Sequence, residues 1–186
     1  SVNRPEFREV STSVYYDFDL ASSVEGNPSL KPAYIHNIDF RYEWYPSSGE
    51  SVSVALFYKH FDSPIEWTYT VAGGTDLVYS NKNAKAANNY GLEVDLRKNL
   101  DFIGLNNFSW SFNGALIKSK VEFEKGSKEK DRAMQGQSPY LINTGLFYQH
   151  PKWNLNIAAL YNRIGKRIIG VGRTVGTSGD QTSTIP

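Results

Sequence analysis

Hydrophobic and polar residues alternate along most of this chain. In residues 37–61, NIDFRYEWYPSSGESVSVALFYKHF, the apolar register holds Ile38, Phe40, Tyr42, Trp44, Val52, Val54, Leu56 and Tyr58. The other register is polar or charged, and residues 46–50 carry the proline, serines and glycine of a turn. Because successive side chains of a strand point to opposite faces, this segment predicts a β-hairpin with one apolar face and one charged face.

Alternating runs of this kind recur, and no segment shows a convincing helical period. They span residues 34–45, 51–61, 89–100, 107–123, 139–149 and 153–168. Most are longer than the ~5–6 residues of a typical soluble strand, and they fit the ~9–11 residues of a tilted membrane-spanning strand. We therefore expect an all-β fold, an antiparallel up-and-down meander of about six long strands that forms part of a transmembrane β-barrel.

The connections between the runs alternate strictly in length. Residues 46–50, 98–106 and 150–152 are short connections, whereas residues 62–88, 124–138 and 170–186 are long and polar. Membrane barrels have short turns on one side and long loops on the other. A soluble sandwich has no physical reason to sort its loops in this way, so the alternation favours the barrel.

Aromatic residues fall near both ends of the runs and share the apolar register. Those near long connections are Tyr34, Tyr58, Tyr90, Tyr140 and Tyr161, and those near short connections are Trp44, Phe108, Trp110, Tyr148 and Trp153. Two aromatic girdles around an aliphatic band are typical of the two interfaces of a bilayer. The alternative is that these are ordinary sheet aromatics packed in a soluble core.

Composition excludes several functions. The net charge of +1 gives no basic excess for nucleic acid, and the charged run 124–132 mixes both signs, as a solvated loop tip does. The absence of cysteine excludes disulfides, thiolate metal sites and a cysteine nucleophile. His36, His60 and His150 lack any metal-ligand spacing, so we predict no metal and no cofactor. The low mean hydropathy of −0.46 does not oppose a barrel, whose strands meet lipid on one face only.

The polar register combines carboxylates with arginines. Two clusters stand out: Asp39, Arg41 and Glu43, and then Glu93, Asp95 and Arg97. Carboxylates two residues apart can act as a general acid and base, but neither cluster has an accompanying nucleophile or activating base. We interpret them as structural ladders lining a wet lumen, and we predict no catalytic residues and no enzyme.

Five short elements resemble the late barrel strands of TonB-dependent outer-membrane receptors, and in particular the bacterial outer membrane protein beta-barrel group. They are VNRPEFREV (2–10), GNPSLKP (26–32), YEWYP (42–46), NYGLEVDLRK (89–98) and QSPYLINTGLFY (137–148). In that family the GNPSLKP element lies in an external loop just before a descending strand. Its place here, before the run that starts at Tyr34, agrees.

The resemblance implies an outer-membrane barrel of about 22 strands around an N-terminal plug. Such a receptor imports a scarce ligand, such as a siderophore, cobalamin or a glycan, and an inner-membrane TonB complex pulls on its N-terminal box. We expect residues 1–186 to be a single barrel fragment, with 1–33 and 169–186 as external loops, 34–168 as strands, and the plug domain absent. The implied partners are outer-membrane lipid, the TonB complex through the missing N-terminal part, and the ligand.

Ligand contacts are not fixed by the family motifs, so candidates come from the residues alone. The long connection 62–88 and the residue that follows it carry the aromatics Trp67 and Tyr69 and an Asn-rich stretch, 81–89. Aromatic rings and amides suit recognition of sugars or siderophores. We therefore expect Trp67, Tyr69, Asn81, Asn83 and Asn88 to lie in a mobile external loop and to contact ligand; an ordinary solvent loop is the alternative.

Two other classes remain open. A soluble β-sandwich that binds carbohydrate would hide the apolar register between two sheets and use Greek-key connections. An outer-membrane enzyme would need a serine, a histidine and an acid at the rim, and His60 and His150 have no evident partner. A plain meander with its apolar register facing outward would separate the barrel from the sandwich.

Overall fold

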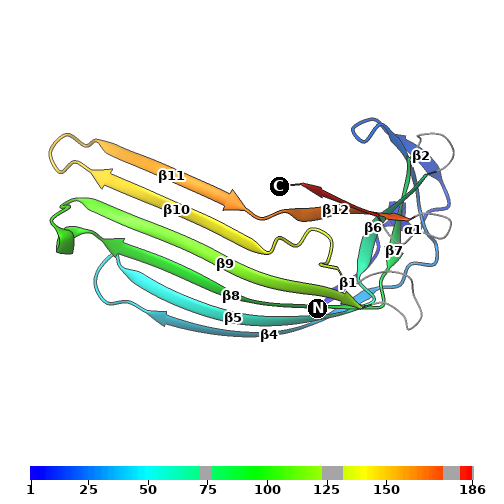
Figure 1. The fold of residues 1–186 in the computed structure, drawn as a ribbon, viewed down its shortest axis with the longest axis horizontal. Helices are drawn as coiled ribbons and strands as arrows, with labels where there is room; N and C mark the ends of the chain where they lie inside the picture. The colour runs from blue at the N-terminus through cyan, green and yellow to red at the C-terminus, as the bar shows by residue number, and fades with distance from the viewer. Residues whose placement is uncertain (72–76, 123–131, 174–180, 186) are drawn as a thin grey trace.

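The computed structural model describes residues 1–71, 77–122, 132–173 and 181–185, and these residues form two β-sheets (Figure 1). The larger sheet has seven strands and the smaller has six among the described residues. The smaller sheet lies at one end of the long strands (Figure 1). The described helices are short, α1 (Phe7–Val10) and η1 (Asp101–Ile103), and neither is long and apolar enough to cross a membrane.

The larger sheet is an antiparallel meander of long strands. They are β4 (Ala33–Trp44), β5 (Ser51–Asp62), β8 (Ala86–Asn99), β9 (Phe108–Glu122), β10 (Tyr140–Gln149) and β11 (Asn156–Ile164), with β1 (Val2–Asn3) beside β4. Each long strand pairs with the next long strand in the sequence. The six strands and the meander predicted from the alternation are confirmed, except that the last run was expected to extend further at both ends.

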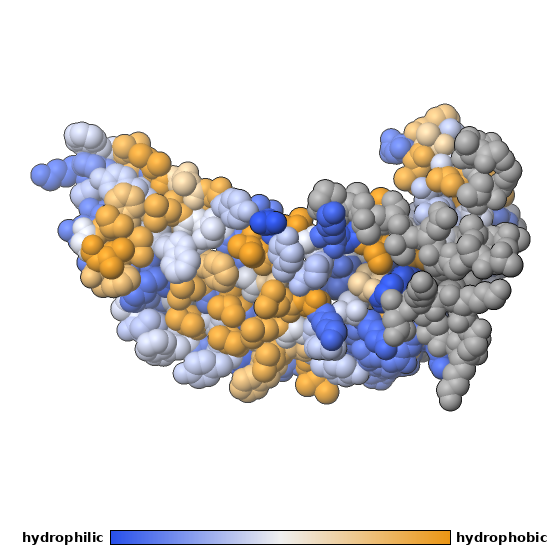
Figure 2. Space-filling view, in the orientation of Figure 1, coloured by the Kyte–Doolittle hydropathy of each residue, from blue (hydrophilic) through white to orange (hydrophobic). Residues whose placement is uncertain are grey.

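The apolar register of this sheet faces outward. From Ile38 to Trp44, the four apolar side chains in that register of β4 are between 55% and 70% exposed, and Leu116 of β9 is 63% exposed. Within the described residues, no second sheet covers these side chains, and apolar residues gather over the long strands in the space-filling view (Figure 2). This arrangement is the opposite of a sandwich, in which the same register would be buried.

Glycines within the long strands let aromatic rings lie against the backbone. A Cβ atom on Gly91 would lie 2.7 Å from the Phe57 ring and 2.6 Å from the Leu116 carbonyl oxygen. A Cβ atom on Gly114 would lie 2.7 Å from the Phe112 ring. Rings that cover strand glycines in this way restore packing where a side chain is missing.

The smaller sheet is built around a hairpin and is partly parallel. Its strands are β2 (Val14–Asp17), β3 (Ser22–Glu25), β6 (Ile65–Val71), β7 (Leu77–Asn83), β12 (Arg167–Arg173) and β13 (Gln181–Ile185). The order is β13-β12-β6-β7-β3-β2, so the β6/β7 hairpin is central. Both β12 and β3 join it in parallel.

This sheet occupies segments that the sequence predicted to be loops. Strands and a helical turn lie within 1–33, the β6/β7 hairpin lies within 62–88, and β12 extends past residue 169, so the expectation of irregular structure was wrong there. The strands are short, and their parallel partners are distant in the sequence, so local alternation does not reveal them. That 1–33 and 169–186 are external segments stays a prediction.

We expect the isolated chain not to disperse as a monomer in detergent-free buffer. Its outward apolar side chains lack a cover, β11 is an open edge, and β1 pairs with only Tyr34 and Ala33 of β4. Both features drive association. Light scattering on purified protein checks this, with detergent micelles as the control condition. A stable 21.0 kDa monomer that unfolds cooperatively without detergent would contradict the outward placement.

Candidate ligand-binding site

One face of the β6/β7 hairpin collects most of the predicted ligand residues. The segment IEWTYTV of β6 is rich in β-branched and aromatic residues, which favour a strand. Antiparallel pairing sets Trp67 opposite Asn81 and Tyr69 opposite Tyr79. These four side chains therefore share a face with Asn83, which lies two residues beyond Asn81.

Three aromatic rings on this face form a continuous cluster. Trp67 stacks on Tyr79 with ring centroids 5.5 Å apart and an interplanar angle of 21°, and Tyr69 meets the same tyrosine at 5.8 Å. All three side chains are partly exposed. Burial, with a smaller effect from neighbouring Tyr79, raises the pKa of the Tyr69 phenol, which therefore stays a neutral hydrogen-bond donor at neutral pH.

Tyr69 is held in place by the backbone of β12. Its cross-strand partner there is Gly172, and a Cβ atom at Gly172 would lie 2.6 Å from the Tyr69 ring. Any larger residue at this position would displace the ring. The glycine-rich sequence of β12 thus allows the aromatic cluster to pack directly against the strand.

The amides of Asn81 and Asn83 are used within the protein. Asn81 Nδ2 donates to Glu9 Oε1 at 3.1 Å, and the backbone carbonyl oxygen of Asn81 accepts from Asn27 Nδ2 at 3.0 Å. Asn83 Oδ1 accepts from the Lys31 amide at 2.8 Å, and Asn83 Nδ2 donates to the Lys31 carbonyl at 2.9 Å. These bonds attach the segment around GNPSLKP to β7, so both asparagines support the aromatic cluster from the side.

Asn88 lies apart from the other four candidates, on the outward register of β8. Its Oδ1 accepts a hydrogen bond from the Tyr58 hydroxyl and contacts the His60 ring, each at 2.7 Å. Its Nδ2 donates to Glu122 at 2.7 Å. All five candidates occupy strands, and four of them share one face. Contact with ligand stays a prediction for every one of them.

A buried ion pair supports the opposite face of the hairpin. Glu66 is 3% exposed, and Arg132 donates to both of its carboxylate oxygens at 2.9 and 2.7 Å. The Gln135 backbone amide also donates to Glu66, at 3.4 Å, while the Trp67 amide donates to Gln135 Oε1 at 2.6 Å. The position of Trp67 is therefore tied to the segment that follows β9.

Residues 132–138, which we call the strap, connect this hairpin to the large sheet. The Val121 amide donates to the Arg132 carbonyl at 2.9 Å, and the Met134 amide donates to Ser119 Oγ at 2.9 Å. At the other side, the Gly136 amide donates to the Ile168 carbonyl at 2.8 Å. The strap thus bridges β9, β6 and the start of β12.

Sequence reasoning missed both the strap and Tyr79. The run 124–132 was read as a solvated loop tip; residues 123–131 lie outside the described residues, but Arg132 itself is paired in the interior. A single arginine in a charged run gives no sign that its partner is 66 residues away. Tyr79 could have been found from the alternation of residues 77–83.

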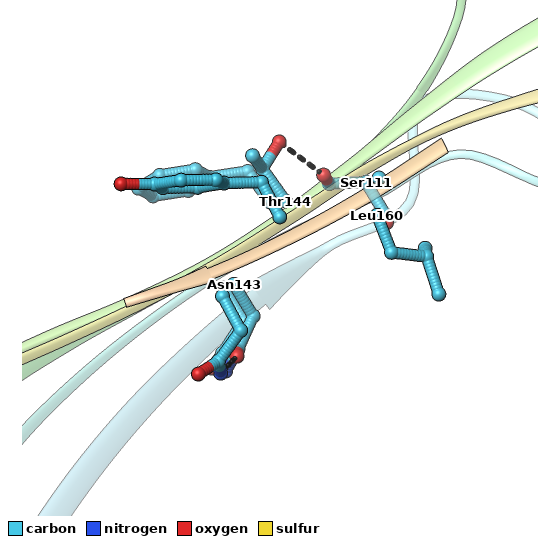
Figure 3. Close-up of a pocket in the computed structure, with 9 residues that line it drawn as sticks. Ser111, Asn143, Thr144 and Leu160 are labelled. Carbon is cyan, nitrogen blue, oxygen red and sulfur yellow. Dashed lines mark hydrogen bonds between the residues drawn. The ribbon is translucent and has the colours of Figure 1, made fainter. Parts of the chain in front are cut away.

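The inward register of the large sheet carries a hydrogen-bonded ladder of polar side chains. Asn113 Nδ2 donates to Asp95 Oδ1 at 2.6 Å, Asn143 Nδ2 donates to Asn113 Oδ1 at 3.0 Å, and Asn162 donates to Asn143. The three asparagines border a shallow hollow of about 330 Å³. In Figure 3, Asn143 points away from Thr144, whose hydroxyl donates to the Ser111 carbonyl at 3.0 Å. Within the two charge clusters predicted as ladders on this face, Arg41 contacts Glu43 at 2.5 Å and Asp95 of the other cluster at 3.6 Å.

Comparison with known proteins establishes the family. Residues 2–185 match the model of the TonB dependent receptor-like β-barrel, so the chain belongs to this family. No curated protein matches it significantly. The resemblance drawn from the five sequence elements is therefore confirmed, and the chain is a segment of an outer-membrane receptor barrel.

Solved receptors share the fold. The ferric enterobactin receptor PfeA of Pseudomonas aeruginosa, in a mutant form bound to enterobactin, has a TM-score of 0.52 at 21% identity, covering 80% of this chain and 21% of that chain. The siderophore receptor PirA of Acinetobacter baumannii has a TM-score of 0.50 at 15% identity, covering 78% and 21%. The present chain thus spans about a fifth of their length. These relatives are receptors rather than enzymes, and the sandwich alternative has no support.

Removing one partner of the buried ion pair should loosen the hairpin. Arg132→Ala leaves the Glu66 carboxylate buried without its partner, which costs about 3–5 kcal/mol, whereas Glu66→Leu combined with Arg132→Met should cost less. Hydrogen exchange of the β6 and β7 amides in the full receptor measures the difference. Lys82→Ala, at an exposed position opposite Glu66, is the control. Protection in Arg132→Ala equal to that of the unaltered receptor would show that the pair does not hold the hairpin.

Proposed function

We propose that this chain supplies part of the barrel wall and an external ligand-binding sheet of a TonB-dependent outer-membrane receptor that imports a siderophore-type ligand. The observation that carries the proposal is the family match across residues 2–185. The outward apolar register and inward polar register of the long strands support it, since an imported solute needs a wet lumen inside a lipid-facing wall. The names of the solved relatives favour a ferric siderophore over cobalamin or a glycan.

Within this function, the aromatic cluster is the proposed contact surface for the ligand. Trp67, Tyr69 and Tyr79 offer partly exposed ring faces and two phenol groups on a sheet held firmly by the strap. Rigid aromatic surfaces with a few polar groups bind ligands at low entropic cost. Asn81 and Asn83 are positioning residues in this proposal, because their amides already bind the segment before β4.

The remaining partners belong to the whole receptor. Lipid covers the outward register, and the TonB complex acts through an N-terminal part that this sequence does not include. Asn88 has no role at the ligand surface in this proposal, because it lies on the outward register of the other sheet.

Replacing the cluster should impair import while leaving the barrel intact. In the full receptor, Trp67→Ala combined with Tyr69→Ala should weaken ligand binding about 10-fold or more, as loss of central aromatic contacts does. Growth on single ferric siderophores under iron limitation, together with direct binding, measures this. Phe102→Ala, at an exposed aromatic 69% accessible near the opposite end of the strands, is the control.

Two outcomes distinguish failure of the proposed ligand surface from failure of the proposed import function. Import of every ligand at normal affinity by the double variant would place the ligand surface elsewhere. Deletion of the whole receptor without loss of uptake for any ferric siderophore would overturn the siderophore assignment, and parallel assays with cobalamin and oligosaccharides would then identify the alternative class.

A further inference from the structure

Charge is distributed unevenly between the two faces of the large sheet. The acidic residues in the middle of the long strands lie on the inward register: Asp39, Glu43, Glu93 and Asp95. From the row of Ile38, Tyr58 and Tyr90 toward the short connections, the outward register of these fully described strands holds no carboxylate. Its ionised groups there are three cations: Lys98, Lys118 and Arg163.

These three cations differ in their surroundings. Lys98 lies at the short-connection end and is paired with Glu50 at 2.7 Å. Lys118 and Arg163 lie toward the long-connection ends of β9 and β11, and neither has a carboxylate partner within the described part of the chain. Glu122, further along β9, accepts a hydrogen bond from Asn88 instead. Two positive charges on the outward face therefore have no carboxylate partner among the described residues.

Each cation lies next to the apolar band of its own strand, on the side of the long connections; positions nearer the short connections are called below it. On β9, the next outward residue below Lys118 is Leu116, which is 63% exposed. On β11, the next outward residues below Arg163 are Tyr161, 54% exposed, and then Ala159 and Ile157, the latter 55% exposed. Long cationic side chains at such positions keep their stems on apolar surface and extend their charge to the headgroup layer.

The strand register places Lys118, Tyr140 and Arg163 on a diagonal line across three neighbouring strands. Lys118 pairs with Tyr90, whereas Leu116, two residues along β9, pairs with Tyr140 of β10. Ile142, two residues along β10, pairs with Arg163. Each cation is therefore two residues away from the position directly opposite Tyr140, one on β9 and one on β11.

Tyr140 lies between the two cations on the intervening strand. The Arg163 guanidinium carbon is 5.9 Å from the centre of the Tyr140 ring. On the other side, Tyr90 is the cross-strand neighbour of Lys118 and is 45% exposed. Lys118 and Arg163 are each diagonal cross-strand neighbours of Tyr140, at the ~7–8 Å spacing that long side chains can span, so both can reach one headgroup over the Tyr140 ring.

We propose that Lys118, Tyr140 and Arg163 form a binding site for the phosphate of an anionic lipid headgroup on the outer wall of the barrel. The cations supply charge, and the Tyr140 phenol supplies a hydrogen-bond donor. A lipid is the occupant because the site continues directly into the exposed apolar band, which takes the acyl chains. This site is separate from the ligand surface of the hairpin and does not depend on the import proposal.

Lipid retention by the full receptor tests the site. The receptor in neutral-detergent micelles is titrated with phosphatidylglycerol or with phosphatidylcholine of the same acyl chains, and bound lipid is counted by native mass spectrometry. We expect phosphatidylglycerol to bind preferentially, and Lys118→Gln combined with Arg163→Gln to weaken that binding about 10-fold or more. Siderophore import by this variant should be unchanged.

Controls distinguish the site from general charge effects and from misfolding. Lys82→Gln removes an exposed cation from the small sheet and should leave lipid binding unchanged. Resistance of the barrel to unfolding in dodecyl sulfate shows that the variants fold. A Lys118→Arg variant keeps the positive charge and should retain lipid binding. Equal retention of the two lipids, no loss in the double variant, or full competition by free inorganic phosphate would each overturn the proposal.

Discussion

A sheet that crosses a lipid layer must satisfy its backbone hydrogen bonds between strands, because hydrocarbon offers no alternative partner. This constraint explains the long, uninterrupted antiparallel ladders from β4 to β11. It also explains the two registers, since one face of every strand meets lipid and the other meets water. Within this sheet, aromatic rings pack over strand glycines, and the ladder from Asp95 to Asn162 links neighbouring strands on the inward face.

The smaller sheet is paired differently from the larger one. Its strands are short, two of its pairings are parallel, and it depends on specific long-range contacts. The Glu66–Arg132 pair and the asparagine amides of β7 hold the strands of the smaller sheet in position. In the wall, periodic strand pairing has this role. The proposed ligand surface on this sheet is held in place by these long-range contacts.

Sequence reasoning succeeded where the pattern is local and failed where it is not. The run from Ile38 to Tyr58 shows its hairpin in consecutive residues, so the wall could be predicted strand by strand. Ser22–Glu25 could not, because four residues carry too little periodicity and their partner β7 lies far along the chain. Trp67 and Tyr69 were proposed as ligand contacts from residue type alone. The separation of Asn88 from Asn81 and Asn83 required knowing which sheet each belongs to.

The parallel pairing of β12 with β6 has a consequence for the entropy of folding. The hairpin ends at Asn83, but the strand that completes its other side begins only at Arg167, after the last long strand. The pairing of β6 with β12 therefore closes a loop of the chain that includes four strands of the wall. Closing a loop of this length costs conformational entropy, which the specific contacts of the smaller sheet must offset.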